Sequence, residues 1–280
     1  MSNAEQVEYW NGKVGETWVR MQERMDLALT PVTAALLSLA APQPGEHALD
    51  VGCGSGETTL ALSGAVGDDG LAIGIDISEP LLARARERAE ELLSEADFRT
   101  ADAATFDDEA DGFDLVVSRF GVMFFADPVA AFANLFRLAC PGARLCFACW
   151  QPPSENLWAT LPLQLLADVL PPQPPADPHA PGPFAFADPE HTGAILAAAG
   201  WQDIAFHAMP FAMVMGTGDD PVAAAVQFAL RIGPAARAVR EAGPAAEAVA
   251  KERLAAAYAG HLAAGEVALP AAIWLVSARA

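Results

Sequence analysis

The chain has 280 residues, of which 53% are hydrophobic, and a formal net charge of −20 from 36 acidic and 16 basic side chains. This length and hydrophobicity allow a large core in one or two domains and exclude a disordered chain. The negative charge disfavours nucleic acid and anionic membrane surfaces as partners. The N-terminal MSNAEQVEYWNGK lacks the basic start and apolar stretch of a signal peptide, and no apolar run could span a bilayer. We therefore expect a soluble, cytoplasmic protein.

The first 150 residues alternate between helical and strand-like patterns. Residues 4–27 are typical of a polar and aromatic helix, and Thr30 followed by Pro31 predicts a new helix that ends near Ala41. HALDVG predicts a buried strand, and a glycine turn joins it to a helix, ETTLALSGAV. Further strands are predicted at LAIGIDI, ADFRTAD, FDLVVSRF and GARLCFACW, with helices over 79–93 and 129–139. Such apolar strands alternating with helices indicate a parallel sheet covered on both faces.

The alternation ends after Trp150. Residues 151–189 are rich in proline, but a helix-like run from Leu157 to Leu170 and the apolar Phe184 and Phe186 favour a packed insertion over a linker. EHTGAILAAAG then predicts a helix, IAFHAMPFAMVMG a strand and AIWLVSAR a last strand, with Ala-rich helices over 221–264 between the two strands.

The four cysteines are Cys53, Cys140, Cys146 and Cys149, and the last two form a C-x-x-C. A zinc site would need a second pair of ligands at similar spacing, and a redox pair would favour a helix N-terminus. This pair lies in an apolar, strand-like run. We therefore expect buried structural thiols and no metal site.

The turn after the first predicted strand, LDVGCGSGETTL, contains Gly52, Gly54 and Gly56, with Asp50 just before them. Glycine weakens both strands and helices, so this turn indicates close approach of the backbone to a ligand. The following helix would offer free N–H groups to an anionic group, at the sheet edge where open α/β folds bind ligands. Dinucleotide-binding folds use G-x-G-x-x-G, whereas the spacing here is G-x-G-x-G.

This pattern resembles the class I S-adenosylmethionine-dependent methyltransferases, and three later stations agree with it over residues 47–150. Asp76 ends the second strand, Asp102 ends the third, and VVSRFGVMFFADP follows the fourth. The chain most resembles the small-molecule branch that includes the ubiquinone and menaquinone C-methyltransferases, whose lid is similar to YWNGKVGETWVRMQERMD. The resemblance implies a Rossmann-like seven-stranded sheet, mostly parallel, with AIWLVSAR antiparallel beside IAFHAMPF, helices on both faces and helical lid insertions.

The resemblance also implies roles for individual residues. Asp50 would steer the methionine amino group, directly or through water, Asp76 would bind the ribose, and Asp102 and Ala103 would read the adenine edge. The other implied cofactor contacts are Gly52, Gly54, Gly56, Ile77, Ser118 and Arg119. The residues implied for the lid or acceptor pocket are Tyr9, Trp10, Trp18, Met25, Phe120 and Met123.

Purely structural roles are open alternatives for several of these side chains. Asp76 and Asp102 could cap helices, and Arg119 could be an ion-pair partner inside the fold. The lid residues Trp10, Trp18 and Met25 could be ordinary core.

These observations predict a single domain over residues 1–280. Its expected parts are a helical lid (1–45), a cofactor-binding core (46–150), acceptor-side insertions (151–189 and 217–268) and C-terminal sheet elements (190–216 and 269–280). The expected reaction moves a methyl group from S-adenosylmethionine, leaving S-adenosylhomocysteine, to a small apolar or aromatic acceptor through orientation and exclusion of water.

A general base is needed only if the acceptor is protonated at working pH, and the sequence offers Tyr9 and His207 as weak candidates. Two other functions stay open. One is a non-catalytic nucleotide-binding module, and the other is an NAD-dependent oxidoreductase, which the glycine spacing and Asp102 disfavour. The acceptor, the atom that is methylated and the oligomeric state, including a homodimer, are not determined by the sequence.

Overall fold

The structure is a computed structural model of the whole chain, and it describes residues 3–108, 112–171 and 177–280. Within these residues eight strands form one sheet with the main order β3-β2-β1-β4-β5-β8-β6, and β7 pairs with β8. The strands are β1 (His47–Val51), β2 (Leu71–Asp76), β3 (Asp97–Thr100), β4 (Phe113–Arg119), β5 (Ala139–Trp150), β6 (Gln202–Gly216), β7 (Leu262–Ala263) and β8 (Glu266–Arg279).

The expected seven-stranded, mostly parallel sheet is confirmed in the main strand order. β1 to β5 pair in parallel, and β8 lies antiparallel between β5 and β6. The short β7 adds an eighth strand within residues 221–264, which the sequence pattern indicated to be helical. It is a two-residue partner of β8 across a tight turn, too short to give a periodic signal.

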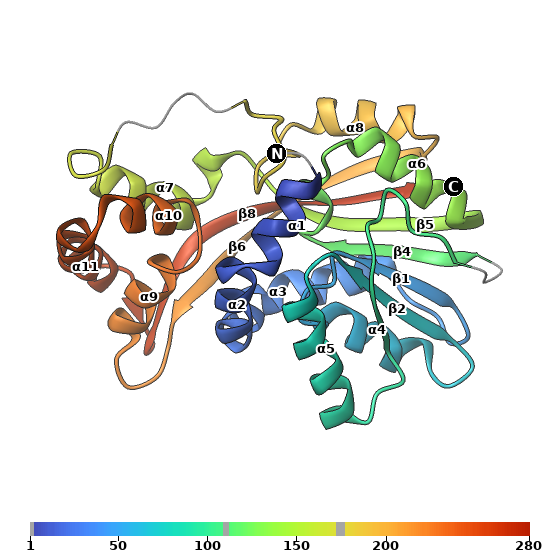
Figure 1. Cartoon of the computed structure of the whole chain (residues 1–280), viewed down its shortest axis with the longest axis horizontal. Coiled ribbons are helices and arrows are strands. Elements are labelled where there is room, and N and C mark those ends of the chain that lie inside the picture. Colours follow the sequence, from blue (N-terminus) through green and yellow to red (C-terminus); the bar gives the residue numbers. More distant parts are fainter. Residues whose placement is uncertain (1–2, 109–111, 172–176) are drawn as a thin grey trace.

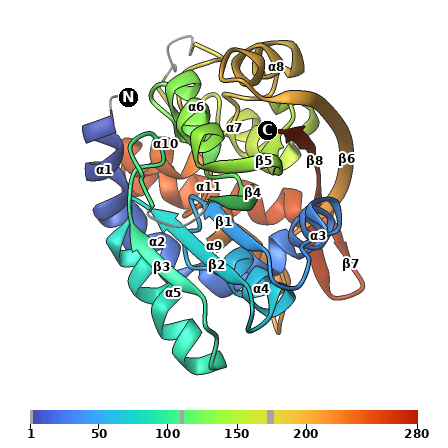
Figure 2. The same ribbon diagram turned by 90° about the vertical axis from the view of Figure 1, so that its right-hand side faces the viewer.

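Helices cover both faces of the sheet, as Figures 1 and 2 show. One face carries α3 (Gln22–Ala40), α4 (Glu57–Val66) and α5 (Glu79–Leu92), and the other carries α6 (Pro128–Leu138) and α8 (Pro189–Ala198). The central strands are therefore buried on both sides, and Leu49, Val116 and Val117 have no exposed surface. This explains why these strands read as continuous apolar runs.

The N-terminal region forms three helices, α1 (Asn3–Asn11), α2 (Lys13–Arg20) and α3. The predicted helix start at Thr30 and Pro31 is wrong, because both residues lie inside α3. Thr30 donates its hydroxyl to the carbonyl of Asp26 at 2.9 Å. Pro31 removes one backbone donor, but the carbonyl four residues earlier belongs to Leu27, which is 45% exposed, so water can replace that donor.

α3 is part of the core, although the sequence grouped it with the lid. It packs against β4, β5, β6 and β8, and Leu36 and Val32 are fully buried. The N-terminal elements that stand outside the sheet layers are α1 and α2, which we call the lid helices.

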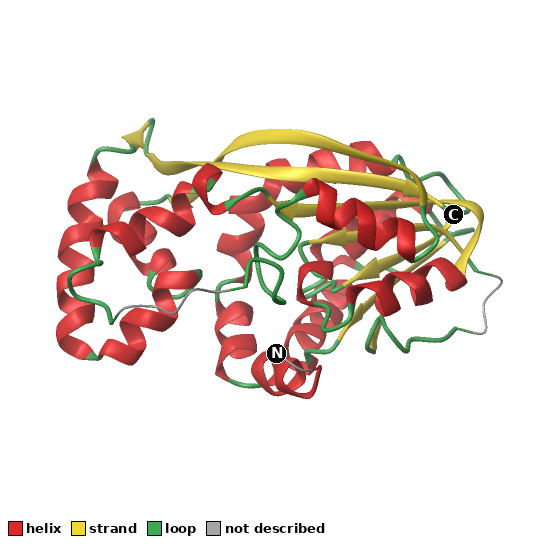
Figure 3. Ribbon diagram, turned by 90° about the horizontal axis from the view of Figure 1, so that it is seen from above, coloured by secondary structure: helices red, strands yellow, loops and turns green. Residues whose placement is uncertain are grey.

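β6 and β8 extend beyond the other strands and carry a group of helices, seen in Figure 3. We call this group the helical cap: α7 (Leu157–Leu165), α9 (Pro221–Ala229), α10 (Pro234–Ala242) and α11 (Pro244–Ala259). β8 begins before the predicted strand AIWLVSAR. Its first residues also pair with the extended part of β6, with Pro270 opposite Ala212. The predicted helix from Leu157 stops at Leu165, and residues 172–176 of the proline-rich insertion lie outside the described residues.

The described ranges contain no single helix that is long and apolar enough to cross a membrane. One pair, α9 with α10, reaches that length only when both helices are counted together across a 79° bend.

Candidate functional site

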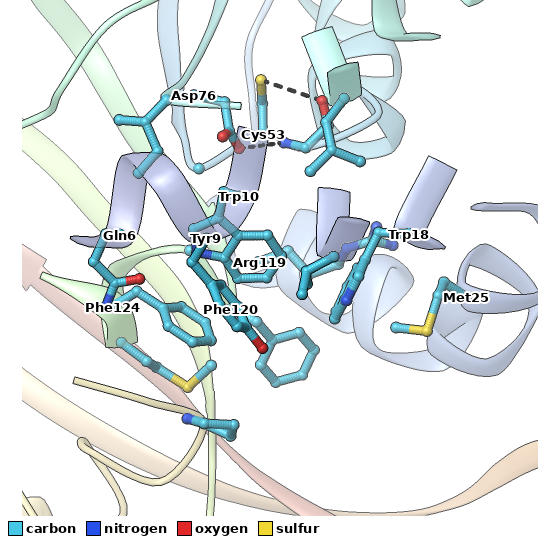
Figure 4. Close-up of a pocket in the computed structure, with 18 of the residues that line it drawn as sticks. Gln6, Tyr9, Trp10, Trp18, Met25, Cys53, Asp76, Arg119, Phe120 and Phe124 are labelled. Carbon is cyan, nitrogen blue, oxygen red and sulfur yellow. Dashed lines mark hydrogen bonds between the residues drawn. The ribbon is translucent and has the colours of Figure 1, made fainter. Parts of the chain in front are cut away.

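A cavity of about 610 Å³ lies at the carboxyl edge of β1 to β4. The glycine turn and the strand ends line one side, the lid helices cover it, and the helical cap supplies a further wall through Trp158, Ile232 and Ala236. Figure 4 shows side chains from the lid and from the strand ends that converge on this space. Because three separate parts of the chain enclose it, the cavity can bury a ligand of considerable size.

The three glycines of the turn have different functions. A Cβ on Gly54 would meet no atom within 4 Å, and its backbone N–H donates to Asp76 Oδ2 at 2.9 Å. A Cβ on Gly52 would come within 2.6 Å of the Gly121 backbone, and one on Gly56 within 2.7 Å of the Phe98 ring. All three have positive φ, which favours glycine. Gly52 and Gly54 line the cavity, whereas Gly56 does not, so Gly56 serves helix packing.

Asp50 on β1 is 1% exposed and lines the cavity. Its Oδ2 accepts a 2.7 Å hydrogen bond from Thr59 Oγ1, while Oδ1 has no partner among the described residues. Burial raises the pKa of Asp50 to about 6, against the opposing effects of the Thr59 hydrogen bond and the Arg119 charge. A buried carboxylate with a free oxygen is a site for a cationic or donor group.

Asp76, at the end of β2, accepts hydrogen bonds from the backbone of two neighbouring turns. Its Oδ2 receives Gly54 N–H and its Oδ1 receives Ser78 N–H at 2.8 Å. Burial raises the pKa of Asp76, opposed by these N–H donors. Each carboxylate oxygen keeps further acceptor capacity, so Asp76 can both fix the glycine turn and bind a hydroxyl.

Asp102 follows β3 and also touches the lid. Its Oδ1 accepts Ala104 N–H at 2.9 Å, and its Oδ2 accepts the side-chain amide of Asn3 at 2.8 Å. The lid is further held by Ser78 Oγ, which donates to Trp10 O at 2.8 Å, and by Asn11, which donates to Ile77 O at 2.8 Å. The lid helices are therefore tied to the ends of β2 and β3.

Ser118 and Arg119 end β4 and differ in exposure to the cavity. Ser118 is fully buried, donates to Val51 O at 2.7 Å and accepts from Gly121 N–H and Val122 N–H. It does not line the cavity, and its hydroxyl joins β4 to β1; its contact with the methionine end stays a prediction.

Arg119 lines the cavity and also makes structural contacts. Its guanidinium donates to Thr33 at 2.8 Å and pairs with Asp26 at 3.3 Å. Asp26 also pairs with Arg88 at 3.2 Å, and Arg88 pairs with Glu57 at 2.5 Å. This network joins α3, α4, α5 and β4 behind the cavity, so Arg119 has the structural role as well as a place in the wall.

Aromatic rings form the side of the cavity away from the acids. Phe120 has a left-handed φ of 67°, which is rare for a bulky residue, and it stacks on Trp150 with ring centroids 4.4 Å apart. Trp10 makes edge contacts with Trp18 at 5.5 Å and with Phe124 at 5.4 Å. The rings of Trp10 and Phe120 face the same space in Figure 4.

Most residues expected at the site from the sequence line this cavity. They are Tyr9, Trp10, Trp18, Met25, Asp50, Gly52, Gly54, Asp76, Ile77, Asp102, Ala103, Arg119, Phe120 and Met123. His207 is an error of the sequence analysis: it is exposed on β6, opposite Leu275, and does not line the cavity. The alternation of side chains along a strand did not determine which face of the sheet would carry His207. In the structure β6 is an edge strand, and the His207 side chain is exposed to solvent.

Sequence reasoning missed the lining residues that only tertiary packing brings to the site. They are Gln6, Trp150, Trp158, Arg231, Arg237 and Arg240. Arg237 pairs with Glu241 at 2.7 Å. The only local signal was the polar Gln6 within an aromatic helix. The cap residues are distant in sequence from the glycine motif, and no short-range pattern connects them.

The cysteines are buried as expected at three of their four positions, and Cys140 is half-buried. Cys53, Cys146 and Cys149 are buried, and burial raises the pKa of the Cys146 thiol to about 11. Over the described parts of the chain, no group of three or more His, Cys, Asp or Glu side chains could hold a metal ion.

Comparison with known proteins agrees with the fold and the cavity. Residues 48–142 match the family described as "Methyltransferase domain". Nocamycin O-methyltransferase of Saccharothrix syringae is 34% identical over 183 residues, which cover 62% of this chain and 65% of that protein. Demethylmenaquinone methyltransferase of Bacillus mycoides (strain KBAB4) is 36% identical over 112 residues, which cover 39% of this chain and 47% of that protein. The matches thus span about half to two thirds of these relatives.

Among solved structures, magnesium protoporphyrin IX methyltransferase from Synechocystis PCC 6803 with bound S-adenosylhomocysteine has a TM-score of 0.55. It is 21% identical, and the match covers 76% of this chain and 93% of that one. At this identity the likeness shows the fold alone. Over part of its length the chain is therefore similar to S-adenosylmethionine-dependent methyltransferases of small molecules, and residues 48–142 match the methyltransferase domain family.

Proposed function

We propose that the chain transfers a methyl group from S-adenosylmethionine to a small, apolar or aromatic acceptor, leaving S-adenosylhomocysteine. The observation that carries this proposal is the buried Asp50, which lines the cavity and whose Oδ1 has no partner among the described residues. The amino group of the methionine portion has the charge and the donors that this oxygen lacks.

The other residues of the strand ends fit the rest of the cofactor. The open face of Gly54 admits a ligand where a side chain would intrude. Asp76 has acceptor capacity for the ribose hydroxyls. Asp102 and Ala103 follow β3 and line the cavity, where they would meet the adenine edge. Ile77 supplies an apolar surface for the base.

The chemistry needs few groups from the chain. When bound, S-adenosylmethionine supplies a methyl group on a sulfonium, which is already electrophilic. The aromatic side chains Phe120, Trp10 and Trp150 exclude water and hold the acceptor in line. Tyr9 lines the cavity, and we propose its phenol as a proton relay, which takes the proton of the acceptor molecule while it passes its own proton to solvent.

The acceptor side of the cavity is formed by the helical cap. Trp158, Ile232 and Ala236 give it an apolar surface beside Arg231, Arg237 and Arg240, and this apolar surface supports an apolar or aromatic acceptor. The names of the relatives, a nocamycin O-methyltransferase and a demethylmenaquinone methyltransferase, refer to small-molecule acceptors and support the same class. We also propose that residues 1–280 act as one unit in the cytoplasm. Analytical ultracentrifugation of the purified chain tests whether it forms a homodimer.

The test is a screen for formation of S-adenosylhomocysteine. The purified chain is incubated with S-adenosylmethionine and a panel of hydroxylated or enolic aromatic compounds, and product is measured by mass spectrometry. We expect acceptor-dependent release of S-adenosylhomocysteine. Binding of the cofactor without turnover on any acceptor would favour the non-catalytic module instead, since a fold does not determine a function. A response to NAD alone would favour the oxidoreductase.

A further inference from the structure

Gln6 is a buried amide that the cofactor contacts described above do not use. It lies on α1, is 1% exposed and lines the cavity. Neither its Nε2 nor its Oε1 has a hydrogen-bond partner among the described residues. Figure 4 shows its side chain projecting from α1 toward Phe124. A buried side-chain amide without partners is rare in folded proteins, so a ligand group at this place would complete it.

The position of Gln6 on α1 points to the nucleoside. α1 is tied at one end to Asp102, through Asn3 at 2.8 Å, and at the other end to Ser78, through the Trp10 carbonyl at 2.8 Å. Gln6 lies between these two contacts, roughly 4.5 Å along the helix from Asn3 at the usual rise per residue. The helix segment that carries Gln6 therefore covers the region between the ends of β3 and β2.

The chemistry of an amide restricts its partner. An amide presents a donor and an acceptor side by side, so a complementary group must present an acceptor beside a donor. Adenine does so at N7 and the N6 amino group, the pair of atoms that Gln and Asn bind in other settings. In the proposed cofactor mode, Asp102 and Ala103 take the opposite edge of the base, which leaves N7 and one amino hydrogen free.

We propose that Gln6 binds adenine in this way, donating from Nε2 to N7 and accepting the second amino hydrogen at Oε1. This inference rests on the proposed function. It makes the lid part of nucleoside recognition, because the two polar atoms of Gln6 gain partners only when the base is bound and α1 lies over it. Gln6 is then a specificity-determining residue that distinguishes adenine from bases without this pair of atoms.

The test is a double-mutant cycle between the protein and the ligand. Affinities for S-adenosylhomocysteine and for its 7-deaza analogue, in which N7 is replaced by C–H, are measured by calorimetry on the full chain, on Gln6→Met and on Glu8→Met. Glu8 lies on the exposed side of the same helix, so Glu8→Met is the matched control. We expect the unmodified chain and the control to lose roughly tenfold in affinity for the 7-deaza analogue.

Gln6→Met should bind S-adenosylhomocysteine roughly tenfold more weakly and show no further loss with the 7-deaza analogue. Its melting temperature without ligand should not fall, because the amide that is removed has no partner. Gln6→Glu, which keeps the shape but loses the donor, should show the same insensitivity to N7 and guards against a misfolded first variant.

An equal loss with the 7-deaza analogue in the unmodified chain and in Gln6→Met would overturn the inference. So would full affinity of Gln6→Met for S-adenosylhomocysteine with a raised KM for the acceptor, which would place Gln6 against the acceptor instead. If the unmodified chain does not bind S-adenosylhomocysteine at all, the proposed function fails, and this inference with it; the two failures are thus distinguishable.

Discussion

The two sides of the cavity differ in how their side chains are held. On the strand side, Asp76 and Asp102 are fixed by backbone N–H groups of adjacent turns. On the covering side, Trp10, Trp18 and Trp158 are held by packing against other rings. Acids that are held by backbone N–H groups suit a cofactor, because its polar groups are always the same. A wall of packed aromatic side chains can be repacked to fit different acceptors. We therefore expect the choice of acceptor to depend on the aromatic side chains of the covering side rather than on the acids, with Gln6 as the covering-side residue that we propose to bind the cofactor.

Removal of residues 1–20 should have the largest effect. The shortened chain keeps α3, which packs on the sheet, so it should fold and give a cooperative melting curve. Methyl transfer should fall by at least about 100-fold, since orientation and exclusion of water can contribute roughly 7–11 kcal/mol. Near-normal turnover by a folded variant would show that the lid helices take no part in the reaction. In the full chain, proteolysis of this segment should slow when S-adenosylhomocysteine is added.

Asp50→Asn should separate binding from stability on the strand side. Affinity for S-adenosylhomocysteine should fall by roughly 10- to 100-fold because a charge-assisted hydrogen bond is lost. At pH 7 the variant without ligand should be more stable by about 1–3 kcal/mol, because a carboxylate whose folded pKa is raised to about 6 costs free energy when it ionises. Calorimetric binding and chemical unfolding measure the two quantities. A loss of stability without ligand would contradict the account of Asp50 as an unpaired buried acid.

Asp76→Ala should weaken S-adenosylhomocysteine binding by about 1.5–3 kcal/mol, through the loss of hydrogen bonds from the ribose. The variant should also lose roughly 1–2 kcal/mol of stability without ligand, because Gly54 N–H and Ser78 N–H lose their acceptor. The hydrogen bonds of Asp76 show its structural role, and ribose binding stays a prediction. Full affinity combined with lost stability would leave only the structural role.

The pH dependence of binding tests the same acid without mutation. The pKa of Asp50 in the free chain is about 6, and a cation beside it should lower that pKa in the complex. Affinity for S-adenosylhomocysteine should therefore be highest above pH 6 and fall by up to about tenfold per unit below it. Without ligand, the contribution of Asp50 to the free energy of unfolding is most favourable below its unfolded pKa near 4. This contribution is lost as the pH rises through the folded pKa of about 6. A flat affinity profile from pH 5 to 7.5 would remove Asp50 from the binding site.

Arg240→Gln should have the smallest effect and should act only on the covering side. Arg240 is exposed at the wall of the cavity formed by α10, so its charge is largely screened. Affinity for S-adenosylhomocysteine should stay within about twofold, while the KM of the acceptor changes by a few-fold at most. A large loss of cofactor affinity would show that the two sides are not separable.

The same contrast explains what could be predicted from the sequence. Gly54, Asp50 and Asp76 were predictable because a strand, a turn and a helix adjacent in sequence place them, and the sheet order brings the strand ends together. Gln6, Trp158 and the cap arginines could not be predicted, since their place depends on long-range packing. Gly56 and Ser118 belong to the motif but serve packing and strand coupling, a distinction that only the contacts of their atoms reveal.

Two errors arose where local rules compete with tertiary structure. Thr30 and Pro31 form a good helix start, yet α3 continues through them because its apolar face packs on the sheet. The sequence allowed His207 to lie on either face of its strand. In the structure it lies on the edge strand β6 and is exposed to solvent. Both outcomes are set by neighbours that are remote in sequence.

The central claim is that this cavity binds the adenosyl cofactor, and titration calorimetry of S-adenosylhomocysteine into the purified full chain at pH 7.5 tests it most directly. The account predicts binding of one ligand per chain, a matching rise in melting temperature, and a clear loss of affinity in Asp50→Asn. No heat and no thermal shift with S-adenosylhomocysteine, alongside a clear response to NAD, would contradict it.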